Sequence, residues 1–244
     1  MGKIQAGEIE QEIEQFLADL DRAWPGGYTA VLIGSAARGQ YLPGWSDINM
    51  LLILPEITPE ALRAARQPLQ RWRERAEALP LLFDADEWHR SNDAYPLEIV
   101  EMQTGYKVLR GHDPVGGMHV RPAYLRTALE RELRGKLMRL RQGYALFAPG
   151  SEKLTGFLLN SASSVLLLCR GLLVLSGEPV PTDPPAIVAA AGRVAGFPPD
   201  AVARVIARRG DRSWRCTEEE VGGYLAAVQT AARFVDHFQI GART

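Results

Sequence analysis

A polar loop framed by two apolar segments is the feature that most constrains how this chain folds. The segments 28–33 and 48–54 are short and almost continuously apolar, and they stop at Gly34 and Pro55. Such runs are typical of strands that are buried on both faces of a sheet. The sequence therefore predicts two central strands, with the polar loop 34–47 connecting them at one edge of the sheet.

The remainder of the first half alternates between helical and strand patterns. Apolar residues three and four apart predict helices, and short β-rich runs predict strands. The expected elements are a helix over 9–23, a helix from Thr58-Pro59-Glu60 to about Leu79 with a break at Pro68, a strand over 81–83, a helical turn over 86–90 and a strand over 97–102.

Beyond Pro122 the pattern is helical throughout. Apolar stripes and capping residues predict helices over 125–147 and 153–175, one beginning at Asp183, and one beginning at the capping box of Thr217 and Glu220. The expected fold class is therefore α/β (α+β): a mixed sheet with flanking helices, followed by an all-α helical bundle. We expect a first domain over residues 1–117 and a helical C-terminal domain over 118–244.

Composition excludes several classes of function. Lys+Arg 28 against Asp+Glu 29 gives no long-range field suited to nucleic acid, which is not an expected partner. Two cysteines, Cys169 and Cys216, and a start without an export signal predict a cytoplasmic protein. The most apolar stretch, 157–175, contains Arg170, so we expect a buried bundle helix and no membrane partner. The sequence leaves the oligomeric state open.

The loop itself carries groups suited to phosphate chemistry. A Gly34-Ser35 turn opening onto a helix exposes backbone N–H groups and a hydroxyl, which suit a phosphate oxygen. Asp47 and Asn49 are two residues apart on a strand, so both side chains face one side and can converge on a hard cation. An anion cradle beside a cation-binding pair is what nucleotidyl transfer requires.

These residues resemble the signature of the nucleotidyltransferase superfamily that includes polymerase beta, in particular its small antibiotic-type branch. The matching run is Gly-Ser-Ala-Ala-Arg-Gly over 34–39, followed by Ser-Asp-Ile over 46–48. The resemblance implies Mg²⁺ and a nucleoside triphosphate, with ATP expected, and an unknown acceptor as partner. It also implies that Gly34, Ser35, Arg38 and Ser46 contact the nucleotide, whereas Asp47 and Asn49 hold the metal.

A third carboxylate completes the site in this family. Residues 95–100 resemble the later strand that supplies it, which makes Glu98 the candidate metal ligand and, with Asp47, the candidate catalytic residue. The alternative is an edge-strand carboxylate facing water, and Glu101 and Asp93 are the next candidates.

Asn49 departs from the family pattern because a carboxylate is expected there. An amide offers an oxygen to a cation but lacks the charge that offsets dehydration of magnesium. Three functions therefore remain. The first is a metal-dependent transfer of a nucleoside monophosphate to a hydroxyl of a small molecule or protein, and the second is a catalytically degenerate module that binds a nucleotide or partner. The third is a helical interaction protein with a vestigial α/β lobe.

Two further patterns are interpreted as surface features. The basic residues of the helix over 125–147 could meet triphosphate, but the interspersed Glu130 and Glu132 favour a salt-bridged face. The histidines show no metal-ligand spacing, and Arg233 with His237 is interpreted as a surface pair.

Overall fold

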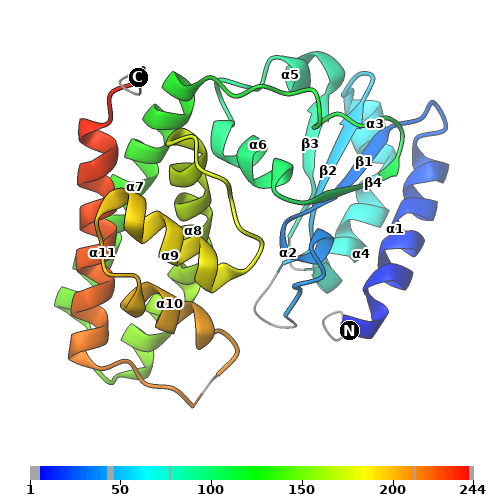
Figure 1. Cartoon of the computed structure of the whole chain (residues 1–244). Helices are drawn as coiled ribbons and strands as arrows, with labels where there is room; N and C mark the ends of the chain where they lie inside the picture. The colour runs from blue at the N-terminus through cyan, green and yellow to red at the C-terminus, as the bar shows by residue number, and fades with distance from the viewer. Residues whose placement is uncertain (1–5, 43–46, 77, 212, 242–244) are drawn as a thin grey trace. The chain divides into compact units, whose positions relative to one another are not determined.

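The computed structural model describes residues 6–42, 47–76, 78–211 and 213–241. The chain divides into two compact units (Figure 1), and each is considered by itself. The first contains Met1–Asn92 and Gly105–His119; the second contains Asp93–Thr104 and Val120–Thr244.

The first unit is built on a mixed four-stranded sheet. Its strands are β1 (Thr29–Ile33), β2 (Asn49–Leu54), β3 (Leu81–Asp84) and β4 (Tyr106–Arg110), in the order β3-β2-β1-β4. β1 is antiparallel to both β2 and β4, whereas β2 and β3 are parallel. β1 and β2 are thus the two central strands that the apolar runs predict.

Helices cover one face of this sheet. The unit contains η1 (Ala6–Glu8), α1 (Ile9–Ala23), α2 (Gly34–Ala37), α3 (Pro59–Ala64), α4 (Arg66–Ala76) and α5 (Ala85–His89). Leu32 and Met50 pack into a buried cluster with residues of α1 and α4, where the rings of Phe16 and Trp72 stack at 4.4 Å. The bounds of α1 match the predicted helix, and Thr58 caps α3 by accepting from Ala61 N.

The second unit is helical. It contains α6 (Pro96–Gln103), α7 (Pro122–Leu146), α8 (Glu152–Leu175), α9 (Pro184–Ala195), α10 (Asp200–Ala207) and α11 (Glu218–His237). By length and composition α8 could cross a membrane, but 72% of its apolar window is buried inside the protein. It is therefore the core helix of the bundle, as the sequence predicts.

The strand predicted over 97–102 is wrong, because these residues form α6. Pro96 stands at a first-turn position and Glu98 follows in the first turn, both of which favour a helix start. The helix packs within the second unit: a Cβ on Gly171 of α8 would lie 2.8 Å from Leu97 Cδ2, so glycine allows the close approach. Buried Arg170 also pairs with Glu101 at 3.5 Å.

Two elements were not predicted from the sequence. β4 is the edge strand beside β1, and it ends at the turn of Gly111. α10 is a short amphipathic helix with Val202, Val205 and Ile206 buried. It begins directly after Pro199.

Candidate functional site

Strand register brings the two halves of the polar loop to one edge of the sheet. Ile33, the last residue of β1, pairs with Asn49, the first residue of β2. Because the two strands are antiparallel, the Gly34-Ser35 turn that follows β1 lies beside the residues that precede β2. The phosphate-cradle candidates and the cation-ligand candidates therefore share one edge.

The turn itself requires glycine. Gly34 has φ +74°, a left-handed conformation that L side chains rarely adopt. A Cβ built on it would lie 3.6 Å from Asn49 Nδ2, so the Asn49 carboxamide lies directly against the turn. The Ser35 hydroxyl, half-buried, has no hydrogen-bond partner among the described residues. It is thus available to a ligand.

The helix that follows the turn is shorter than the sequence suggests. α2 is a single turn of four residues, closed by Gln40 N donating to Ser35 O at 2.8 Å. A helix this short has no developed macrodipole. Any anion bound here would therefore be held by individual N–H groups and by the Ser35 hydroxyl.

Asp47 and Asn49 face the same side. Both residues are exposed, whereas Ile48 between them is buried at 1% exposure. This alternation is that of an extended chain, in which side chains two apart lie on one face. Asp47 forms no ion pair or hydrogen bond with another described residue, so its carboxylate is open to solvent. Ser46 lies outside the described residues.

Arg38 follows the turn, and its side chain lies against Gly105, the residue before β4. A Cβ on Gly105 would lie 2.5 Å from Arg38 Cγ, so the aliphatic part of Arg38 crosses directly over Gly105. Its guanidinium Nε is buried. The structure therefore holds the aliphatic part of Arg38 against the residue that precedes β4.

The donor set suits a magnesium ion only in part. Among the described residues, no group of three or more His, Cys, Asp or Glu side chains is placed to hold a metal. Mg²⁺ usually keeps several waters and takes one or two carboxylates together with substrate phosphates. Asp47 and Asn49 fit that pattern, with the nucleotide supplying further oxygens, but they do not form a metal site on their own.

The beginning of the neighbouring strand, β3, offers no acid among its described residues. Leu81 at the start of β3 pairs with Leu51 in parallel register, so the beginnings of β2 and β3 lie at the same edge. The side chains there are Leu79 and Leu81, which are 53% and 40% exposed. Glu77 lies outside the described residues. At the beginning of β3, a further metal ligand would lie close to Asn49, and the side chains found there are leucines.

Glu98 lies in the second unit, on α6. The residue is exposed, yet partial desolvation of its carboxylate raises its pKa, against a smaller lowering by a hydrogen bond from its own backbone N–H; the charges of Glu132 and Arg131 act in opposite directions and matter less. Its assignment as a third metal ligand stays a prediction. Of the next candidates, Glu101 is paired with Arg170, and Asp93 lies in the turn before α6.

One cavity near the motif lies on the opposite face of the sheet. It measures about 790 Å³ and is lined by α1, Leu32, Lys107 and Leu109 together with Ala36, Ala37, Gly39 and Tyr41. Leu32 and Leu109 belong to the face covered by α1, whereas Asn49 pairs with Ile33 on the other. This cavity is therefore separate from the candidate site.

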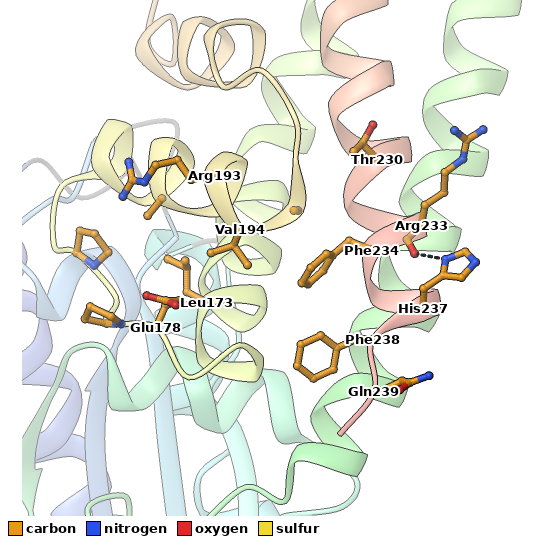
Figure 2. Close-up of a pocket in the computed structure, with 14 residues that line it drawn as sticks. Leu173, Glu178, Arg193, Val194, Thr230, Arg233, Phe234, His237, Phe238 and Gln239 are labelled. Carbon is orange, nitrogen blue, oxygen red and sulfur yellow. Dashed lines mark hydrogen bonds between the residues drawn. The ribbon is translucent and has the colours of Figure 1, made fainter. Parts of the chain in front are cut away.

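A larger cavity, about 980 Å³, lies in the second unit between α9 and α11. Figure 2 shows Phe234 and Phe238 pointing from α11 towards the side of α9 that carries Arg193. Arg233 and His237 of α11 stand at the border of this cavity, and His237 Nδ1 donates to Arg233 O at 2.8 Å. Both residues are exposed, so the interpretation as a surface pair is confirmed.

The basic face of α7 is a network of ion pairs. Arg134 pairs with Asp236 at 2.6 Å and with Glu130 at 3.2 Å. Arg126 donates to the carbonyl oxygens of Asp236 and Phe238 near the end of α11. These arginines hold α7 to α11, which confirms the salt-bridged interpretation for them.

Comparison with known proteins agrees with this geometry. Residues 13–107 match the family model of the nucleotidyltransferase domain. Among solved structures, the chain is similar to the spectinomycin adenyltransferase AAD(9) from Enterococcus faecialis with ATP and spectinomycin, with a TM-score of 0.61 and 12% identity over 93% of this chain and 99% of that chain. No curated protein matches in sequence. Residues 13–107 therefore match a nucleotidyltransferase domain, and the chain has a fold similar to that of this adenyltransferase.

Proposed function

We propose that this protein transfers a nucleoside monophosphate, with ATP as the expected donor, to a hydroxyl of a small molecule or protein, using Mg²⁺. The observation that carries the proposal is the β1–β2 register, which puts the Gly34-Ser35 turn and the Asp47 carboxylate at one edge of the sheet. The adenyltransferase with a similar fold contains ATP and spectinomycin, which supports a triphosphate donor and a small hydroxylated acceptor.

Each residue of the edge has a defined part in this reaction. The N–H groups of the turn and the Ser35 hydroxyl bind phosphate oxygens, and Asp47 with Asn49 binds the metal. Bound Mg²⁺ would neutralise charge that develops on the phosphate oxygens. An acceptor oxygen attacks the α-phosphorus, the bond to pyrophosphate breaks, and the acceptor proton leaves to solvent. The chain contributes positioning of the substrates and electrostatic stabilisation, which account for most of the catalysis in such transfers.

The direct test is Asp47→Ala, with Asp86→Ala as the matched control. Asp86 is an exposed carboxylate of the same unit, paired only across one helical turn with Arg90. Pyrophosphate release from ATP would be measured with Mg²⁺ and aminocyclitol acceptors, spectinomycin first. We expect Asp47→Ala to abolish release with an unchanged melting temperature, and Asp86→Ala to leave both unchanged. Release that survives Asp47→Ala refutes the assignment.

A second candidate function is nucleotide binding without turnover. The observation that favours it is the composition of the edge, where Asn49 and the exposed leucines 79 and 81 stand beside a single described carboxylate. Fewer carboxylates mean weaker metal binding and a poorer clamp on the attacking and leaving oxygens. Such a protein would still bind triphosphate through the turn.

Asn49→Asp separates the two functions. If the edge is otherwise intact, the added charge should raise Mg²⁺ affinity in the presence of a nonhydrolysable ATP analogue by about tenfold and increase pyrophosphate release. The control is Asn160→Asp, which adds the same charge at an exposed position of α8. A gain in affinity without turnover supports the binding module. Absence of any ATP-induced thermal shift in the wild-type protein at millimolar ligand contradicts both functions.

A further inference from the structure

One face of α3 and α4 forms a regular stripe of leucine and arginine. Its members are Leu62, Arg66, Leu69 and Arg73, spaced by four, three and four residues. Hydrogen bonds run from Ala65 N to Ala61 O at 3.2 Å and from Leu69 N to Ala65 O at 2.9 Å, so the two helices follow each other closely. Spacing of this kind places the side chains along one line of a helix surface.

The stripe lines a groove on the first unit, in the region of α3 and α4 in Figure 1. The groove measures about 520 Å³, and Leu79 before β3 forms part of its wall. Leu62 and Leu79 are 40% and 53% exposed. We call this surface the Leu–Arg groove, defined by Leu62, Arg66, Leu69, Arg73 and Leu79.

The arginines of this region fall into two groups. Those of α4 that face α1 are paired within the chain: Arg71 with Asp19 at 2.9 Å, and Arg75 with Glu12. Arg63, Arg66 and Arg73 line the groove; Arg63 pairs with Glu60 of its own helix, whereas Arg66 and Arg73 are exposed and form no ion pair with a described residue. The groove is therefore locally cationic on a chain whose formal net charge is −1.

We propose that the Leu–Arg groove binds an amphipathic helix of a partner protein that carries leucine-like residues and acidic residues at the same three-and-four spacing. The leucines would cover the partner's apolar stripe, while Arg66 and Arg73 would pair with its carboxylates. A nucleic acid backbone would engage the arginines alone, because phosphate gains nothing from exposed leucines. The alternation of the two residue types thus favours the acidic helix, and the inference does not depend on nucleotide transfer.

The probe is a labelled synthetic helix of about three heptads, with leucine at the stripe positions and glutamate flanking them. Its binding to the full chain would be followed by fluorescence anisotropy. We expect saturable binding that weakens at high salt, because part of the attraction is between charges. Arg66→Glu with Arg73→Glu should weaken it at least tenfold, and Leu62→Ser with Leu79→Ser at least threefold.

Matched controls keep the test decisive. Arg193→Glu with Arg233→Glu makes the same charge change at two exposed arginines of the second unit, and should leave affinity unchanged. Circular dichroism would verify that each variant is folded. Equal binding of a leucine–lysine helix, no binding of the acidic helix, or tighter binding of oligouridylate that ignores the leucine changes would each overturn the proposal.

Discussion

Polar side chains are used in opposite ways at the sheet edge and inside the helical unit. At the edge, the side chains of Ser35, Asp47 and Asn49 form no hydrogen bond or ion pair with a described residue. Inside the helical unit, the Tyr224 hydroxyl bonds Ser161 at 2.8 Å, and Glu101 pairs with buried Arg170. A polar group without a protein partner is inexpensive only where water reaches it. The edge is therefore equipped for a ligand, and the helical interior for stability.

The largest effect on stability is expected from Glu101→Ala. The change leaves Arg170, which is 3% exposed, without its α6 carboxylate. Removing one partner of a buried pair costs about 3 kcal/mol, at the lower end because Glu101 is partly exposed. Urea unfolding followed by circular dichroism would measure the loss, while ATP affinity should change far less than stability.

Glu74→Ala is the control for this change, because Glu74 is an exposed acid of α4 with no ion pair among described residues. It should leave the free energy of unfolding within about 0.5 kcal/mol of the wild type. If Glu101→Ala behaves in the same way, the pair with Arg170 has no role in holding α6, and the contrast between the two regions fails at that point.

A smaller effect on stability, but a larger one on ligand binding, is expected from Gly34→Ala. A left-handed conformation costs a residue with a side chain about 1 to 2 kcal/mol. The new methyl group would also lie 3.6 Å from Asn49 Nδ2, at the side of the turn that faces the cation-ligand pair. We expect ATP affinity, measured by calorimetry with Mg²⁺, to fall at least tenfold.

Gly27→Ala controls for backbone strain alone. Gly27 has φ +86°, and a Cβ there would meet nothing within 4 Å. The two variants should lose similar stability, while only Gly34→Ala loses ATP affinity. Equal affinity in both would mean that the turn does not bind the nucleotide.

The central strands and the motif geometry could be predicted because local signals agree there. Apolar runs, stops at glycine and proline, and a spacing of two residues between Asp47 and Asn49 all point to the same arrangement. Capping residues predicted helix starts equally well, as at Thr217, whose side chain accepts from Glu220 N. Each of these features is encoded within a few neighbouring residues.

The interpretation of 95–100 failed because β-branched residues were weighted above the helix-start signals. Ile99 and Val100 favour a strand, but Pro96 and Glu98 fit the first turn of a helix, and tertiary packing decided between them. The acid-poor end of β3 could not be predicted either. Which residues stand beside Asn49 depends on the parallel β2–β3 register, and no local pattern fixes a register between strands so distant in sequence.

Glu98→Gln is expected to give the smallest effect on stability. It tests, in the helical unit, whether a polar side chain there is stabilised by a partner. Desolvation raises the pKa of Glu98 in the folded protein, so between the ordinary and the raised pKa the folded state binds more protons than the unfolded state. The free energy of unfolding therefore falls as pH rises through this interval, and it stays lower at neutral pH than at acidic pH. Glutamine carries no charge, so the variant should melt higher than the wild type at pH 7. The difference should vanish below about pH 4, where glutamate is protonated in both states. A variant that melts lower at pH 7 would instead mean that the Glu98 carboxylate is held by a favourable partner, as Glu101 is by Arg170.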